Sequence, residues 1–111
     1  MSLSPTFEAD DFAANAARVA TVLRALGNTR RLMILCRLIE TGEMTVGALA
    51  DSIGISQSAL SQHLARLRDD GIVTYRRDSQ SVWYRIAEPR IEQLIAELHR
   101  LFCRNAAALQ R

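Results

Sequence analysis

Apolar and polar residues follow one another between Thr45 and Gly71 in a pattern that predicts two short adjacent helices. Thr45 is a residue type that commonly caps a helix N-terminus, and Gly54 is the type that commonly ends a helix. Only Ile55 separates Gly54 from Ser56, a second candidate N-cap. A turn this short between two helices is typical of a helix-turn-helix motif.

The second helix of this pair, predicted to run to about Asp70, has an apolar stripe and a polar face. Leu60, Leu64 and Leu67 fall on one side at ~100° per residue, so we expect them to pack inward. The first turn and the opposite side carry hydroxyl, amide and guanidinium groups, which can hydrogen-bond to base edges in the major groove of DNA. The candidate DNA-contacting residues of this helix are Gln57, Ser58, Ser61, Gln62 and Arg66. A polar outer helix that binds no partner is the alternative.

A β-hairpin is predicted directly after this helix. The stretches Ile72 to Arg77 and Val82 to Ile86 alternate like strands and are rich in β-branched and aromatic residues, and a polar turn joins them. A hairpin in this position forms the wing of a winged helix-turn-helix. Arg76 and Arg77 are expected at its tip, where they suit contact with the DNA backbone or minor groove, although basic hairpin tips also serve solubility. Trp83 and Tyr84 should point to opposite faces, so at least one of them packs on the core.

Two longer amphipathic helices are predicted at either end of the chain. The first runs from Asp10 or Asp11 to Leu26, and the last from Pro89 to about Ala108. A shorter helix, Thr29 to Glu40, follows the first. The heptad spacing of the first helix suits a core as well as a dimer interface. A DNA-binding unit made of the helix-turn-helix and its wing does not need two such long helices. We therefore expect a homodimer formed through the first and last helices, which would double the contact with a palindromic site. The apolar positions of the first helix are Phe12, Ala16, Val19, Leu23 and Leu26.

The composition adds limits to this picture. A chain of 111 residues, 49% hydrophobic and 23% charged, fits one domain, which we place at 10–111 after a flexible tail at 1–9. No apolar run reaches the ~20 residues that span a bilayer, and the first residues do not resemble a signal peptide, so a cytoplasmic protein without membrane contact is expected. The net charge of +2 is too small to predict nucleic-acid binding. All 14 basic residues are Arg, which supports phosphate contacts only weakly.

Three segments of the sequence resemble the ArsR/SmtB family of winged-helix repressors: LRALGNTRRLMILCRLI, SQSALSQHLARLRDDGIV and YRRDSQSVWYRI. The resemblance covers about residues 15 to 105. The pattern S-x-x-S-x-H-L-x-x-L, from Ser58 to Leu67, is typical of the family's recognition helix. His63 within it borders the apolar stripe, so packing and DNA contact both remain open for it. The resemblance implies a mainly α-helical homodimer that occupies operator DNA and leaves it when an inducer arrives.

Metal is one inducer used in this family, but the expected ligands are missing here. The region around the first helix of the helix-turn-helix reads EMTVGALAD, without a C-x-C pair. The last helix offers His99 and Cys103, with Glu92 and Glu97 nearby. Two ligands fall short of the three or four that zinc uses unless the dimer partner contributes. We therefore predict no metal site and no cofactor, and a metal-responsive repressor is kept as an alternative.

The two cysteines, Cys36 and Cys103, point to another inducer. From the residues alone, two unrelated thiols are the simpler interpretation: Cys36 shares the apolar stripe of its helix and is expected to be buried, whereas Cys103 lies off the stripe. However, ILCRL and LHRLFC resemble the paired cysteines of the persulfide-responsive branch of the family. That resemblance implies a redox switch in which reactive sulfur species, or another oxidant, link Cys36 and Cys103 through a disulfide or polysulfide bridge and release the DNA. Cys103, in more polar surroundings, is expected to react first.

An enzyme is not expected. The sequence has no C-x-x-C pair and no Gly-rich cofactor loop. A redox-insensitive winged-helix regulator, and an interaction module that no longer binds DNA, stay open beside the favoured repressor.

Overall fold

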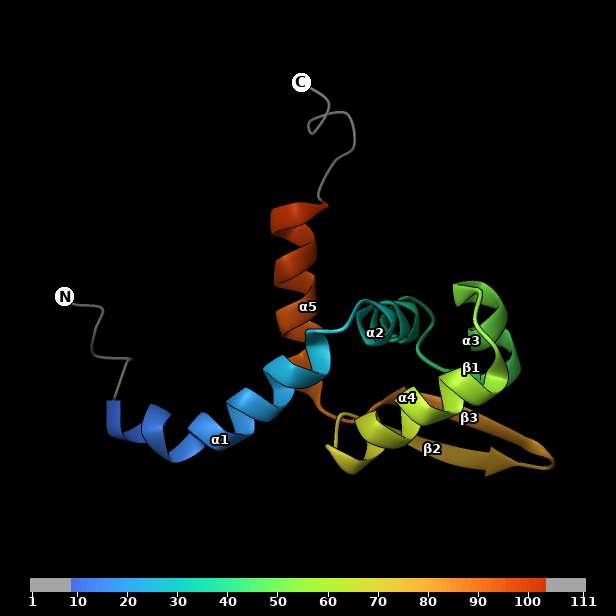
Figure 1. The fold of residues 1–111 in the computed structure, drawn as a ribbon, viewed down its shortest axis with the longest axis horizontal. Helices are drawn as coiled ribbons and strands as arrows, with labels where there is room; N and C mark the ends of the chain where they lie inside the picture. Colours follow the sequence, from blue (N-terminus) through green and yellow to red (C-terminus); the bar gives the residue numbers. More distant parts are fainter. Residues whose placement is uncertain (1–8, 104–111) are drawn as a thin grey trace, which may run out of the picture.

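The computed structural model describes residues 9–103, which form five helices and three strands (Figure 1). In chain order these are α1 (Ala9–Leu26), α2 (Thr29–Thr41), β1 (Met44–Thr45), α3 (Val46–Ile53), α4 (Gln57–Asp69), β2 (Val73–Asp78), β3 (Ser81–Ile86) and α5 (Pro89–Phe102). Figure 1 shows α2 to β3 gathered together, while α1 and α5 extend away from them in different directions. In the described part of the chain, no helix has the length and apolar character needed to cross a membrane.

One hydrophobic core holds the elements together. The predicted stripe of α4 is fully buried, with Leu60, Leu64 and Leu67 at 0–1% exposure. These leucines belong to a cluster with side chains from α2, α3, the hairpin and α5: Ile34, Leu35, Leu38, Leu49, Ile72, Val73, Tyr84, Ile91 and Ile95. Because three buried leucines fix how α4 is rotated, its opposite face must point to solvent.

The sheet has the predicted hairpin and one strand that was not predicted. The strand order is β1-β3-β2, all antiparallel, and the short β1 pairs Met44 with Tyr84 and Thr45 with Trp83. The hairpin strands extend one residue closer to the turn than expected, because Asp78 pairs with Ser81. Tyr84 is buried and Trp83 is half-buried, which confirms that one of the two packs on the core.

The helix ends follow the predicted caps, with one exception. The side chains of Thr45 and Ser56 accept hydrogen bonds from backbone amides at the starts of α3 and α4, and Gly54 ends α3 in a left-handed conformation (φ 82°). The exception is the last helix, whose predicted end near Ala108 is wrong. Cys103 is its C-cap with a non-helical φ of −132°. The rest of that predicted segment, like residues 1–8 of the predicted tail, lies outside the described residues.

Candidate nucleic-acid interface and thiol pair

The outward face of α4 carries the candidate DNA-contacting side chains. The five predicted residues other than His63 are all exposed: Gln57, Ser58, Ser61, Gln62 and Arg66. Two of them have neighbours within hydrogen-bond distance. The Ser58 hydroxyl lies 3.2 Å from that of Ser56, and Arg66 Nε donates to Asp70 Oδ2 at 3.3 Å. The structure therefore brings these five side chains together on one solvent-facing surface.

His63 lies at the border of that surface and is half-buried. Burial lowers the pKa of its imidazole, and the nearby Arg31 and Arg30 lower it further. An imidazole with a lowered pKa is neutral at pH 7. His63 thus lies on the flank of α4 that faces the start of α2.

The two arginines predicted for the wing tip have different surroundings. Arg76 donates two hydrogen bonds of 2.8 Å to the Glu43 carboxylate, and its guanidinium lies 5.5 Å from the centre of the Trp83 ring. This ion pair lowers the pKa of Glu43 and raises that of Arg76. Arg77 is exposed, lies 5.7 Å from the centre of the Tyr75 ring, and has no acidic partner in residues 9–103. Arg77 is the wing arginine that is available to a phosphate.

The Glu43 partner was missed by sequence reasoning. Glu43 lies between α2 and β1, and 33 positions separate it from Arg76. Because Glu43 and Arg76 do not lie on the same helix or strand, no spacing in the sequence indicates that they pair. The pair anchors the wing to the segment that leads into α3, so Arg76 holds the wing in place as well as carrying charge.

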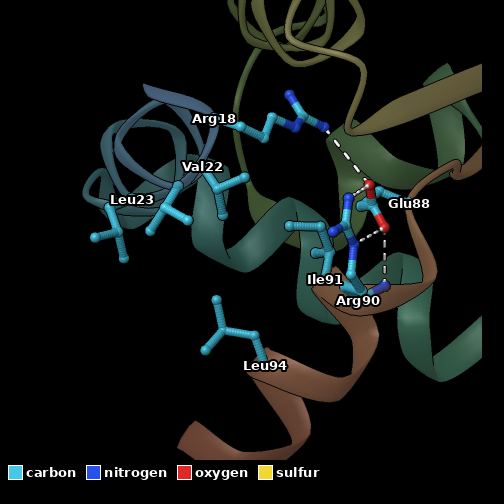
Figure 2. A pocket seen from close by; sticks show the side chains of 8 residues that line it. Arg18, Val22, Leu23, Glu88, Arg90, Ile91 and Leu94 are labelled. Atoms are coloured by element: carbon cyan, nitrogen blue, oxygen red, sulfur yellow. Dashed lines mark hydrogen bonds and ion pairs between the residues drawn. The ribbon is translucent and has the colours of Figure 1, made fainter. Parts of the chain in front are cut away.

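An apolar groove of about 310 Å³ lies between α1 and α5. Figure 2 shows Val22 and Leu23 of α1 facing Ile91 and Leu94 of α5 across it. The large apolar side chains at its margin and at the end of α5 are exposed, Leu23 by 57% and Phe102 by 69%. In the described chain the first and last helices therefore present an uncovered apolar surface.

Arg18 lies at one end of this groove and joins three helices (Figure 2). Its Nη1 donates to the carbonyl oxygen of Asp70, the C-cap of α4, at 2.5 Å. Its Nη2 lies 3.7 Å from the carboxylate of Glu88, the N-cap of α5. Glu88 also accepts hydrogen bonds from the Arg90 side chain and backbone, and these contacts, together with the charge of Arg18, lower its pKa to about 2.

The two cysteines are free thiols on α2 and at the end of α5. Cys36 is only half-buried, so the prediction that it is buried holds in part, and Cys103 is exposed. Burial raises the pKa of the Cys36 thiol, and the negative charges of Glu40 and Cys103 raise it further against the opposing effect of Arg37. The fold therefore brings the two cysteines close enough to interact electrostatically. In residues 9–103, no three or more His, Cys, Asp and Glu side chains gather in a way that could hold a metal ion.

Comparison with known proteins agrees with this geometry. Residues 28–75, which run from the N-cap of α2 into the wing, match the family model described as bacterial regulatory protein, arsR family. The transcriptional activator HlyU of Vibrio cholerae is 46% identical over 89 residues, which cover 80% of this chain and 82% of that protein. The chain belongs to the arsR family. It is thus a DNA-binding transcriptional regulator with a winged helix-turn-helix fold.

Solved structures of arsR-family relatives share the whole architecture. A structure of reduced HlyU from V. cholerae is 44% identical, with a TM-score of 0.78 over 84% of this chain and 97% of that one. The repressor BigR from Xylella fastidiosa is 41% identical, with a TM-score of 0.80 over 87% and 98%. The homodimeric DNA-binding domain Mb0332 from Mycobacterium bovis is 35% identical, with a TM-score of 0.74 over 86% and 88%. These relatives are named as regulators and not as enzymes.

Proposed function

We propose that this arsR-family chain is a homodimeric repressor that binds operator DNA when its thiols are reduced and leaves it when Cys36 and Cys103 become linked. The observation that carries the proposal is that the two thiols come from different helices and yet lie close enough for the charge of Cys103 to raise the pKa of Cys36. The similarity to a protein solved as reduced HlyU, and to the repressor BigR, supports a redox-dependent regulator.

The exposed apolar surface of α1 and α5 supports the homodimer. An apolar groove whose rim includes a leucine exposed by 57% suits a second copy of the same surface, because a two-fold axis sets each patch against its own equivalent. Mb0332, which shares the fold, is described as homodimeric. Two copies of α4 would then read the two halves of a palindromic site.

The proposed switch is a two-step thiol exchange. The exposed Cys103 thiolate attacks the outer sulfur of a low-molecular-weight persulfide, which leaves a Cys103 persulfide and releases the donor as a thiolate. Cys36 then loses its proton and attacks Cys103 Sγ, which forms the Cys36–Cys103 disulfide and expels hydrosulfide. The two electrons lost by the protein thiols leave with the hydrosulfide. A raised pKa keeps Cys36 protonated at pH 7, which suits the second position in this order.

Single cysteine variants test the switch. A duplex selected from random DNA for binding to the reduced protein serves as the operator, and fluorescence anisotropy measures its affinity. We expect Cys36→Ser and Cys103→Ser to bind this duplex as the wild type does and to retain it when polysulfide is added. The wild type should lose about a hundredfold in affinity, which equals about 2.7 kcal/mol of coupling free energy.

Mass spectrometry of the treated wild type should find a peptide pair joined through Cys36 and Cys103, directly or through added sulfur atoms. Release of the Cys36→Ser, Cys103→Ser double variant by polysulfide would show that another group senses the inducer. That result would refute the thiol switch while leaving the DNA-binding role intact.

A further inference from the structure

The two flanks of α4 face different neighbouring elements. On one side of the buried leucine stripe, the Arg68 guanidinium lies 5.3 Å from the centre of the Tyr75 ring, so this flank faces the wing. At ~100° per residue, His63 falls on the other side of the stripe. His63 is half-buried, and α2 packs against α4. The exposed face of α4 is therefore bordered by the wing on one flank and by α2 on the other.

Two arginines occupy the first turn of α2, and only one of them has a structural role. Arg31 donates from Nε to the carbonyl oxygen of Ala25 at 2.9 Å and from Nη2 to that of Arg24 at 3.1 Å, so it caps the C-terminus of α1. Arg30 is exposed, and its guanidinium has no hydrogen-bond or ion-pair partner in the described chain. Both arginines are close enough to His63 to act on its charge.

The position of Arg30 is unfavourable for the helix that carries it. The N-terminus of a helix bears a partial positive charge, which favours acidic residues and disfavours arginine. The first turn of α2 contains no acidic residue that would offset this effect. An arginine at this position therefore does not stabilise α2. Contact with an anion outside the protein would explain why it is there.

We infer that Arg30 contacts a backbone phosphate of DNA on the side of α4 opposite the wing. A helix in the major groove has a phosphate strand along each of its sides, and a wing arginine reaches only one of them. Arg77 contacts the phosphates of the DNA strand beside the wing, and Arg30 contacts those of the strand on the opposite side of α4. This inference rests on the proposed orientation of α4, with Gln62 and its neighbours facing the bases.

The substitution Arg30→Gln tests the contact. Each phosphate contact contributes about 0.9 to the slope of log K against log salt concentration, so a dimer that loses two should show a slope shallower by about 1.8. Affinity for a specific and for an unrelated duplex should fall by the same factor, on the order of tenfold at moderate salt. The melting temperature should stay the same or rise slightly, because the Arg30 guanidinium makes no hydrogen bond or ion pair within residues 9–103 and its charge opposes the helix dipole.

Arg100→Gln is the matched control, since it removes the same charge from an exposed position on α5, where Arg100 pairs with Glu97. An Arg30→Gln slope equal to that of the wild type or of the control would overturn the inference. The variant Gln62→Ala separates this failure from a wrong orientation of α4. If Gln62→Ala weakens specific binding while Arg30→Gln keeps its slope, only the phosphate contact is refuted; if neither changes binding, both ideas are refuted.

Discussion

Replacing Arg18 by Gln should destabilise the protein although Arg18 lies outside the hydrophobic core. The substitution keeps a polar side chain of similar width but removes the charge and shortens the reach. It breaks the 2.5 Å hydrogen bond to the Asp70 carbonyl oxygen and the 3.7 Å ion pair with Glu88. These two contacts join α1 to the end of α4 and to the start of α5.

The expected loss is about 1–2 kcal/mol of unfolding free energy. A hydrogen bond from a charged donor contributes about 1.5–3 kcal/mol, and an exposed ion pair contributes about 0–1 kcal/mol. We reduce the combined range of about 1.5–4 kcal/mol to about 1–2 kcal/mol because the Arg18 side chain is 37% exposed, and water therefore screens both contacts. For a domain of this size, the loss corresponds to a fall of about 4–8 °C in melting temperature.

Circular dichroism at 222 nm, recorded during heating at one fixed protein concentration, measures this change, since the melting temperature of a dimer depends on concentration. Arg24→Gln is the control on the same helix, because within the described residues the Arg24 guanidinium hydrogen-bonds only to the Thr21 hydroxyl, at 3.5 Å. It should melt within about 2 °C of the wild type. If Arg18→Gln melts together with Arg24→Gln, the bridge between the three helices contributes nothing to stability, and the reasoning is wrong.

Two more variants test the groove region. The pKa of Glu88 is lowered from its usual value near 4.5 to about 2, so its contribution to stability is fully present above about pH 5 and is lost as the pH falls towards 2. The variant Glu88→Gln should therefore flatten the pH dependence of the urea midpoint between about pH 5 and about pH 2. An unchanged curve would count against this role of Glu88. Leu23→Asp places a charge on the exposed rim of the groove and should convert the dimer to a folded monomer, as measured by sedimentation velocity. The control Ala17→Asp, on the opposite side of α1, should leave the dimer intact. A dimeric Leu23→Asp protein would exclude this surface as the interface.

The helix-turn-helix of α3 and α4 was predicted well from the sequence because the signals for its helix ends and its buried face are local. The caps Thr45 and Ser56 and the stop at Gly54 act within three or four residues, and the stripe of α4 repeats with the helical period. The strand β1 was missed because two residues cannot show an alternation. It exists only because β3 offers it an unpaired edge. The end of α5 was placed too late because apolar residues continue beyond Phe102, while the helix does not continue through Cys103.

The candidate site was predictable only where it lies on one element. Once Leu60, Leu64 and Leu67 are buried, the exposed face of α4 follows from geometry alone. By contrast, the Arg76–Glu43 pair and the Arg18–Asp70 hydrogen bond join residues 33 and 52 positions apart, which no periodicity connects. The structure was needed to show that one wing arginine is already paired and that an arginine on α1 contacts the recognition helix.

In the proposed switch, these long-range contacts would let α5 transmit a change at Cys103 to the recognition helix α4. The start of α5 is tied to the end of α4 through Glu88, Arg18 and the Asp70 carbonyl, and its other end carries Cys103, near Cys36 of α2. A bond between the two sulfur atoms would pull one end of a helix whose opposite end is linked to the recognition helix. The hundredfold release requires about 2.7 kcal/mol, whereas the Arg18 bridge contributes about 1–2 kcal/mol in each protomer. Two bridges together contribute about 2–4 kcal/mol, which is of the same order as this coupling. A pull that strains them only while α4 is in its DNA-binding position would therefore account for the release without unfolding any element.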